Sequence, residues 1–197
     1  MKKDLRIIKT KDSLRKALLS LLREKELKEI SVTELCRRAT INRGTFYLHY
    51  KDVHGIMEEY WNHIMTDLKE SYDEPYYQTN FQIENVEAEM VKIFHHVKAH
   101  QDFYQIIFDK KTPMMYYYLL FDIVHALVSD SFSRSELPDD HDIEKTYLIS
   151  YQTNAILGLL LEWHQQDYQT PVEVLNQQLI YSVRWRKGMK ATNDGES

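Results

Sequence analysis

The chain has 197 residues, of which 43% are apolar and 28% are charged, and its net charge is −5. This balance is typical of a soluble globular protein and excludes a largely disordered or membrane-embedded chain. No apolar run approaches the ~20 residues that a membrane span needs, and the basic start lacks the features of a signal peptide. The single Cys36 cannot form an intrachain disulfide, so we expect a protein of the reducing cytoplasm.

Charge is unevenly divided along the chain. Residues 1–51 hold 14 Lys and Arg against 6 Asp and Glu, a surplus of +8, while the remainder carries −13. A basic segment on an acidic body indicates a local surface for a polyanion, although a solvated helix face is the ordinary explanation of such a run. Few Gly and Pro residues and few alternating β-branched runs predict an all-α protein of about nine helices.

Two helices are predicted before residue 40. The first covers roughly 10–24, because apolar residues recur there with the spacing of one helix face, at Leu14, Ala17, Leu18, Leu21 and Leu22. The second runs from Ser31 to about Ala39. Ser31 and Glu34 have the spacing of a capping box, in which each side chain accepts a hydrogen bond from the other residue's backbone amide.

A third and a fourth helix are predicted directly afterwards. Asn42 can cap a very short helix that continues to about Leu48. Asp52 then caps a long helix whose apolar stripe continues to Leu68. Residues 73–80 include a proline and interrupt this pattern, so we expect a connection there.

The rest of the chain also has helical spacing. Helices are predicted over 85–100 and 102–109, from Pro113 onward, over 143–166, and from Pro171 to near Gly188. The organisation that follows has three parts. They are a basic helical segment at 1–51, a longer helical segment at 52–189, and a disordered tail at 190–197.

Residues 31–50 have the layout of a helix-turn-helix, in which a supporting helix precedes a short helix that enters the major groove of DNA. The Arg43 guanidinium matches the O6 and N7 acceptors of guanine. Thr45 can contact a phosphate or a thymine methyl group, and Gly44 lets the backbone come close. The predicted DNA-binding residues, including phosphate contacts that fix the register, are Thr33, Asn42, Arg43, Gly44, Thr45, Tyr47, His49 and Lys51.

Some residues of this segment also have a purely structural explanation. Phe46 and Tyr50 are expected to be core residues that hold the short helix in place. Tyr47 can belong either to the core or to the DNA contacts. Cys36 lies on the apolar side of its helix and is expected to be a small buried residue.

Residues 33–51, TELCRRATINRGTFYLHYK, resemble the N-terminal signature of the TetR family of transcriptional regulators. The resemblance implies a three-helix DNA-binding head at 1–51 and a variable helical regulatory and dimerisation body at 52–189, which often binds a small ligand. The family's DNA contacts usually fall at Thr33, Arg43, Thr45, Tyr47, His49 and Lys51. Two residues depart from the pattern, because Thr40 stands where Gly is common in the turn and Leu48 replaces an often basic residue. Both leave operator specificity open.

The last two predicted helices are the expected dimer interface. The segments NAILGLLLEWHQQ from Asn154 and TPVEVL from Thr170 resemble a C-terminal domain common in TetR-like proteins of Gram-positive bacteria. A two-fold dimer would place two heads on half-sites about one helical turn apart. The predicted interface residues are Leu157, Gly158, Leu161, Leu175, Leu179 and Val183. The alternative is that they pack only within their own domain.

A small-molecule pocket in the body is a further expectation from the resemblance. Six aromatic residues can line it, namely Phe94, Phe103, Tyr104, Phe108, Tyr116 and Tyr117. Aromatic residues at helical spacing are more often ordinary core residues. Some relatives with this kind of body act through a protein partner or as activators, so an inducer is not required.

Neither a metal site nor an enzyme is predicted. His96 and His100 are one helical turn apart, but no acidic or Cys cluster with ligand spacing follows them, so we expect no metal and no cofactor. Gly-rich phosphate loops and the GxSxG and HExxH motifs are absent from the sequence. A protein-interaction bundle is the remaining rival, and it leaves the basic head unexplained.

The sequence therefore predicts a homodimeric TetR-like regulator. Its partners are double-stranded DNA, a second copy of itself, and either a small-molecule effector or a protein partner, with no membrane. We expect a repressor that binds a palindromic operator and is released by a small ligand. The alternative is a transcriptional activator, or a regulator controlled by a protein partner.

Overall fold

The computed structural model describes residues 2–80, 85–134 and 144–191, and the side chains among them from residue 5 to residue 182. Every regular element in these ranges is a helix, which confirms the predicted all-α fold. Short 3₁₀ helices include η1 (Leu27–Glu29) and η3 (Ala88–Met90). The α-helices of this part of the chain are α1 (Lys2–Leu22), α2 (Val32–Ala39), α3 (Arg43–Tyr47), α4 (Val53–Gln78), α5 (Ile93–Ala99), α6 (Gln101–Ile107), α7 (Met114–Arg134), α8 (Lys145–Gln165) and α9 (Val172–Ala191).

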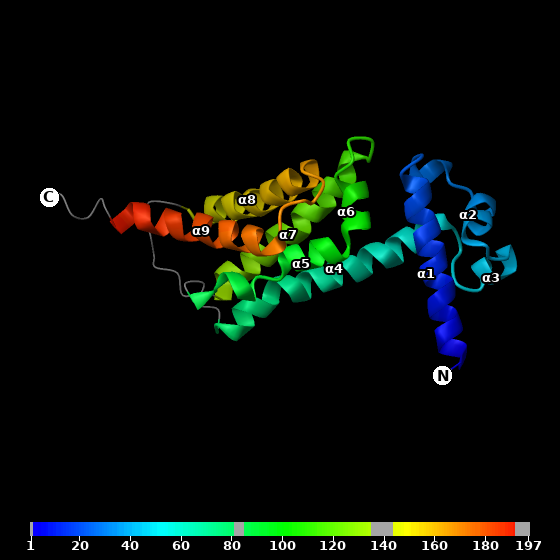
Figure 1. Ribbon diagram of the computed structural model, residues 1–197, viewed down its shortest axis with the longest axis horizontal. Coiled ribbons are helices and arrows are strands. Elements are labelled where there is room, and N and C mark those ends of the chain that lie inside the picture. Colours follow the sequence, from blue (N-terminus) through cyan, green and yellow to red (C-terminus); the bar gives the residue numbers. More distant parts are fainter. Residues whose placement is uncertain (1, 81–84, 135–143, 192–197) are drawn as a thin grey trace. The chain divides into compact units, whose positions relative to one another are not determined.

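The helices form two compact units (Figure 1). The head unit comprises residues 1–66 and 102–113, and the body unit comprises 67–101 and 114–197. The long helix α4 therefore begins in the head unit and ends in the body unit. The predicted domain boundary after residue 51 and the predicted disordered tail stay predictions.

The head unit has an apolar core to which each of its first helices contributes. Its fully buried side chains include Leu14, Leu18 and Leu21 of α1, Leu35 of α2, Phe46 of α3 and Ile56 of α4. Helix α1 begins at Lys2, eight residues before the predicted start. The apolar stripe on which the prediction was based covers only the buried turns of α1, whereas residues 5–9, which precede these turns, are mostly exposed.

The caps of the helix-turn-helix fix where its helices begin and end. Ser31 Oγ accepts a hydrogen bond from the Glu34 amide at 3.2 Å, as predicted. The predicted return bond is replaced, because the Glu34 carboxylate accepts instead from Lys25 Nζ at 2.7 and 2.6 Å. Thr40 ends α2 in the left-handed conformation, with φ 57° and ψ 42°.

The predicted connection at 73–80 is wrong in its first part, because α4 continues to Gln78. Pro75 lies inside the helix and lacks an amide hydrogen, so it removes one backbone hydrogen bond. The helix continues because the turn is held by packing. The Tyr72 and Tyr76 rings lie 5.3 Å apart, and Thr79 Oγ1 donates to the Pro75 carbonyl at 3.0 Å.

The body unit packs around Phe94 of α5 and Trp163 of α8, whose ring centroids are 6.0 Å apart. Trp163 Nε1 donates to the Thr170 carbonyl at 3.0 Å, which fixes the loop before α9. Helix α8 contacts α7, and α9 contacts α5 and η3 (Figure 1). Helix α5 begins at Ile93 rather than at the predicted residue 85, since η3 and extended residues precede it.

Within the described ranges, no helix combines the length and the apolar character that crossing a membrane requires.

Candidate nucleic-acid interface

Helix α3 presents one face to the core and the opposite face to solvent. Phe46 is completely buried, and its ring meets those of Tyr47 at 5.2 Å and Tyr50 at 6.0 Å. Arg43 is exposed on the other side, and Tyr47 is 51% exposed. Of the two explanations left open for Tyr47, the core one is wrong, while Phe46, Tyr50 and Cys36 are buried as expected.

The start of α3 is shaped by its cap. Asn42 Oδ1 accepts a hydrogen bond from the Gly44 amide at 2.7 Å. A Cβ on Gly44 would lie 3.3 Å from that same oxygen, which is a tight contact. Asn42 and Gly44 therefore have a structural role in starting the helix, and their predicted contacts with DNA stay predictions.

The other predicted contact residues lie at the surface of the head unit. Thr33 and Lys51 are exposed, and Thr45 and His49 are half-buried. The Arg43 guanidinium lies 5.9 Å from the Tyr47 ring centroid. This cation–π contact orients a basic and an aromatic group together on the exposed side of α3.

Six basic residues in the described part of the head pair with acidic side chains. Arg37, Arg43 and Lys51 have no ion pair among the residues that the structure describes. Arg37, which the sequence prediction did not include, is exposed on α2 four residues after Thr33 and hence on the same face. The ion pairs are Lys11–Glu59, Lys16–Asp12, Arg23–Asp102, Lys25–Glu34, Lys28–Glu26 and Arg38–Glu24.

The end of the helix-turn-helix is tied to α1 and α4 by one carboxylate. Tyr50 donates its hydroxyl hydrogen to Glu59 Oε1 at 3.1 Å, and Lys11 Nζ pairs with Glu59 Oε2 at 2.6 Å. Burial by itself raises the pKa of the Glu59 carboxyl, but the hydrogen bonds from Lys11 and Tyr50 hold that pKa below its ordinary value. Burial and the neighbouring carboxylate both raise the pKa of Tyr50, so this hydroxyl stays a donor.

The six aromatic residues predicted for a ligand pocket divide between the two units, and the pocket stays a prediction. Phe103, Tyr104 and Phe108 are buried in the head unit, where Phe103 packs on Tyr60 at 5.4 Å. Phe94 is buried in the body unit, in which Tyr116 and Tyr117 are half-buried on α7.

None of these six residues lines the cavity found in the body unit, which measures about 60 Å³. We call it the body cavity. It is small beside the roughly 300–1,000 Å³ of typical ligand sites. It is lined by Ser71, Tyr72, Pro75, Tyr76, Val86, Val91, Lys92, Ile93, Gln152, Ile156, Leu179 and Ile180.

The predicted dimer residues divide between the interior and the surface. Leu157 and Leu175 are buried within the chain itself, and Leu179 lines the body cavity. Gly158 is exposed and Leu161 is half-buried. Val183 belongs to α9, but its side chain lies outside the described residues.

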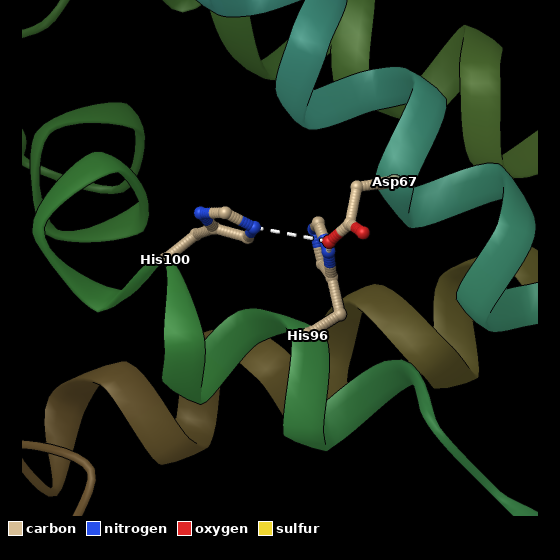
Figure 2. Close-up of side chains that lie close together, drawn as sticks. All are labelled: Asp67, His96 and His100. Atoms are coloured by element: carbon tan, nitrogen blue, oxygen red, sulfur yellow. Dashed lines mark hydrogen bonds and ion pairs between the residues drawn. The ribbon is translucent and has the colours of Figure 1, made fainter. Parts of the chain in front are cut away.

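The expectation of no metal site relied on a missing third ligand, and the structure supplies one. Asp67 of α4 lies against His96 and His100 (Figure 2). No local pattern in the sequence marks this group, because Asp67 lies 29 residues before His96.

Comparisons with known proteins agree with this fold. Residues 84–184 match the TetR-type family model described as "Transcriptional regulator C-terminal region". The chain is 22% identical over 173 residues to an uncharacterized HTH-type transcriptional regulator, YxbF of Bacillus subtilis (strain 168). That match covers 84% of this chain and 42% of the relative, so the chain spans less than half of the relative's length.

Two solved structures resemble the whole chain. A TetR transcriptional regulator from Streptococcus agalactiae 2603V has a TM-score of 0.59 and 25% identity, with 93% of this chain and 98% of that chain covered. The dihydroxyacetone kinase operon activator DhaS has the same TM-score of 0.59 and 19% identity, with 90% and 95% covered. The chain belongs to the TetR family of transcriptional regulators.

Proposed function

We propose that this protein regulates transcription by binding a palindromic operator as a homodimer, with α3 of each copy in the major groove. The observation that carries the proposal is the exposed face of α3. It presents Arg43 and Tyr47 to solvent while Phe46 anchors the opposite face in the core. A short, rigidly held helix with an exposed arginine fork is what reading of a guanine edge requires.

The remaining contacts are assigned to the DNA backbone. Thr33 and Arg37 share one face of α2, and Lys51 follows the helix-turn-helix. Arg37 and Lys51 have no ion pair in the described part of the chain, so a phosphate would not have to displace an acidic side chain. Such contacts fix the register on the duplex and make affinity fall steeply with salt.

The proposed dimer interface consists of exposed residues of α8 and α9, which modifies the residue set expected from sequence. On α8, Tyr147 and Tyr151 are 67% and 59% exposed and align with Gly158 at helical spacing. On α9, Val174 and Tyr181 are 41% and 61% exposed at spacing i and i+7. Large aromatic side chains that are exposed on the surface of a folded unit are typical of a protein–protein interface.

The proposed mode of control is repression released by a small ligand in the body unit. The body cavity supports this in having a mostly apolar lining with the hydroxyl groups of Tyr72 and Tyr76. Its volume of about 60 Å³ admits a few waters, so a larger ligand requires the surrounding side chains to move. Binding there would weaken DNA affinity by a coupling free energy of ~1–3 kcal/mol.

Activation is the second candidate mode. It is favoured by one observation, the likeness of the fold to DhaS, whose name describes an operon activator. At 19% identity this likeness concerns the fold alone. A reporter gene placed behind the operator distinguishes the modes, since deletion of the regulator raises expression under repression and lowers it under activation.

The proposed DNA-binding function is tested by selection of duplexes from a randomised pool with the purified full chain. We expect an enriched inverted repeat whose half-sites are centred about 10 base pairs apart or a multiple of that spacing. Arg43→Ala should enrich the same repeat with one position relaxed. A pool without an enriched repeat would contradict the proposal.

A further inference from the structure

Three potential metal ligands converge inside the body unit, from helices α4 and α5. His96 Nδ1 lies 2.5 Å from Asp67 Oδ2, and His100 Nε2 lies 3.0 Å from the same oxygen. The three ligand atoms all lie within 4.8 Å of one another. Figure 2 shows Asp67 approaching from α4, while both histidines come from α5 and the residue that ends it.

The group is held by the fold. His96 and His100 are four residues apart, so the helical backbone places both rings on one side of α5. Their ring centroids are 4.8 Å apart. The His96 side chain is fully buried, whereas His100 is 21% and Asp67 42% exposed. The site is thus fixed at His96 and accessible to solvent ions from the side of Asp67 and His100.

The chemistry of the donors selects a class of cation. We propose that Asp67, His96 and His100 bind a divalent transition metal ion of the zinc class. Two imidazole nitrogens with one carboxylate suit Zn²⁺, Co²⁺ or Ni²⁺, whereas Mg²⁺ and Ca²⁺ prefer oxygen ligands throughout. Three protein ligands leave a fourth tetrahedral position for water or another donor, as in open zinc sites.

The ligand atoms must shift to accept the ion, because their present separations start at 2.5 Å and extend up to 4.8 Å. Ligand atoms about 2.0–2.2 Å from zinc lie about 3.3–3.6 Å from one another in a tetrahedron. Asp67 Oδ2 must therefore move away from His96 Nδ1, and its partial exposure gives the carboxylate room to turn. The protons that the two ring nitrogens share with Asp67 pass to solvent or to the other ring nitrogen, because a coordinating imidazole needs a free lone pair there.

A bound ion would join α4 to the end of α5 within the body unit. The inference rests on the body unit alone and is independent of DNA binding by the head. If the body unit binds no metal, the proposed DNA binding is unaffected. If the head binds no specific DNA, the proposed metal site is likewise unaffected.

The test uses the full chain without a histidine tag, stripped of metal with EDTA and titrated with Co²⁺. We expect one Co²⁺ per chain with visible ligand-field absorption, and its displacement by Zn²⁺ but not by Mg²⁺. Saturation with Zn²⁺ should also raise the Tm, since the ion binds the folded state. Absence of cobalt absorption together with an unchanged Tm would overturn the proposal.

Variants connect the signal with the three residues. Asp67→Asn and His100→Asn are partly exposed and should fold, and each should weaken Zn²⁺ binding by about 10–100-fold or more. His96→Asn tests the buried ligand. His95→Asn is the matched control, because it removes an exposed imidazole from the same helix and should leave binding unchanged. Equal zinc affinity of wild type, Asp67→Asn and His100→Asn would show that the ion binds elsewhere.

Discussion

Arg43 has the surroundings that a base-reading arginine needs. It is exposed, lies at the first position of α3, has no ion pair within the described chain and is steadied by the Tyr47 ring. A guanidinium that is oriented by a ring and has no ion-pair partner loses little side-chain entropy when it binds guanine, and it displaces no acidic group. The proposed function thus concentrates sequence discrimination in this residue and assigns its basic neighbours to the phosphates.

Arg43→Ala is therefore expected to cost about 1–3 kcal/mol of operator binding and to relax the preference at one base pair. The measurement is competition of operator duplexes carrying single base-pair changes against a labelled operator. Lys51→Ala is the matched control, since a lost phosphate contact weakens binding evenly on all sequences. If Arg43→Ala also weakens binding equally on all duplexes, Arg43 contacts the DNA phosphates and reads no base.

Thr40 carries backbone strain that follows from the left-handed turn between α2 and α3. Its φ of 57° costs a residue with a Cβ roughly 1–2 kcal/mol. Thr40→Gly removes this cost but adds about 0.5–1 kcal/mol of unfolded-chain entropy, so a small net stabilisation remains. We expect the Tm to rise by about 2–4 °C or less in thermal denaturation followed by circular dichroism.

Thr40→Ala is the control for this prediction. Alanine keeps the Cβ and therefore keeps the left-handed cost, so it should not raise the Tm. If alanine stabilises as much as glycine, the strain belongs to the threonine side chain and the conformational argument is wrong.

At the scale of the element, the helix-turn-helix is held to α1 and α4 through Glu59. The pKa of this carboxyl is below its ordinary value of 4.5 because the hydrogen bonds from Lys11 and Tyr50 outweigh burial. A carboxylate with a lowered folded-state pKa stabilises the fold above the unfolded-state pKa. That contribution is lost as the pH falls through the folded-state value.

Wild type should therefore lose more stability than Glu59→Gln as the pH falls from about 6 to about 3. The urea midpoint measured at each pH reports the difference. Tyr50→Phe, which keeps the ring and removes the hydroxyl, should cost about 0.5–1.5 kcal/mol at neutral pH. Parallel pH curves for wild type and Glu59→Gln would show that this carboxylate does not hold the head together.

The elements themselves were largely predictable from local signals. The caps at Ser31 and Asn42 set the starts of α2 and α3, and burial of Phe46 and Tyr50 followed from helical spacing. Pro75 was misjudged because a proline near a helix end costs only one hydrogen bond, which neighbouring packing can offset.

The site was less predictable than the fold, because it depends on contacts distant in sequence. Exposure of Tyr47 is decided by what packs on α3, which a short segment does not reveal. The Asp67 carboxylate meets His96 only because α4 and α5 pack together. The aromatic residues assigned to one pocket belong to two cores, since helical spacing does not distinguish a pocket wall from a packed interior.

At the scale of the whole molecule, the proposal requires two copies of the chain. Gly158 tests this with little risk to the fold, because a Cβ built there meets no atom within 4 Å. Replacing a helical glycine also raises helix propensity. Gly158→Phe should therefore keep the helical circular dichroism and the Tm, yet block the approach of a second α8.

We expect Gly158→Phe to be monomeric in light scattering coupled to gel filtration, and wild type to be dimeric. Ala126→Phe, at an exposed position of α7, is the control and should stay dimeric. A dimeric Gly158→Phe would place the interface on another surface.

Specific DNA binding by the head is the property from which the proposed regulation follows. The direct measurement is fluorescence anisotropy of the purified protein with DNA from upstream of its own gene and with an unrelated duplex, at two salt concentrations. We expect saturable binding at one or two dimers per site that survives the higher salt only on the upstream DNA, while the unrelated duplex is released. Weak binding that is equal on both duplexes and lost together with salt would contradict it.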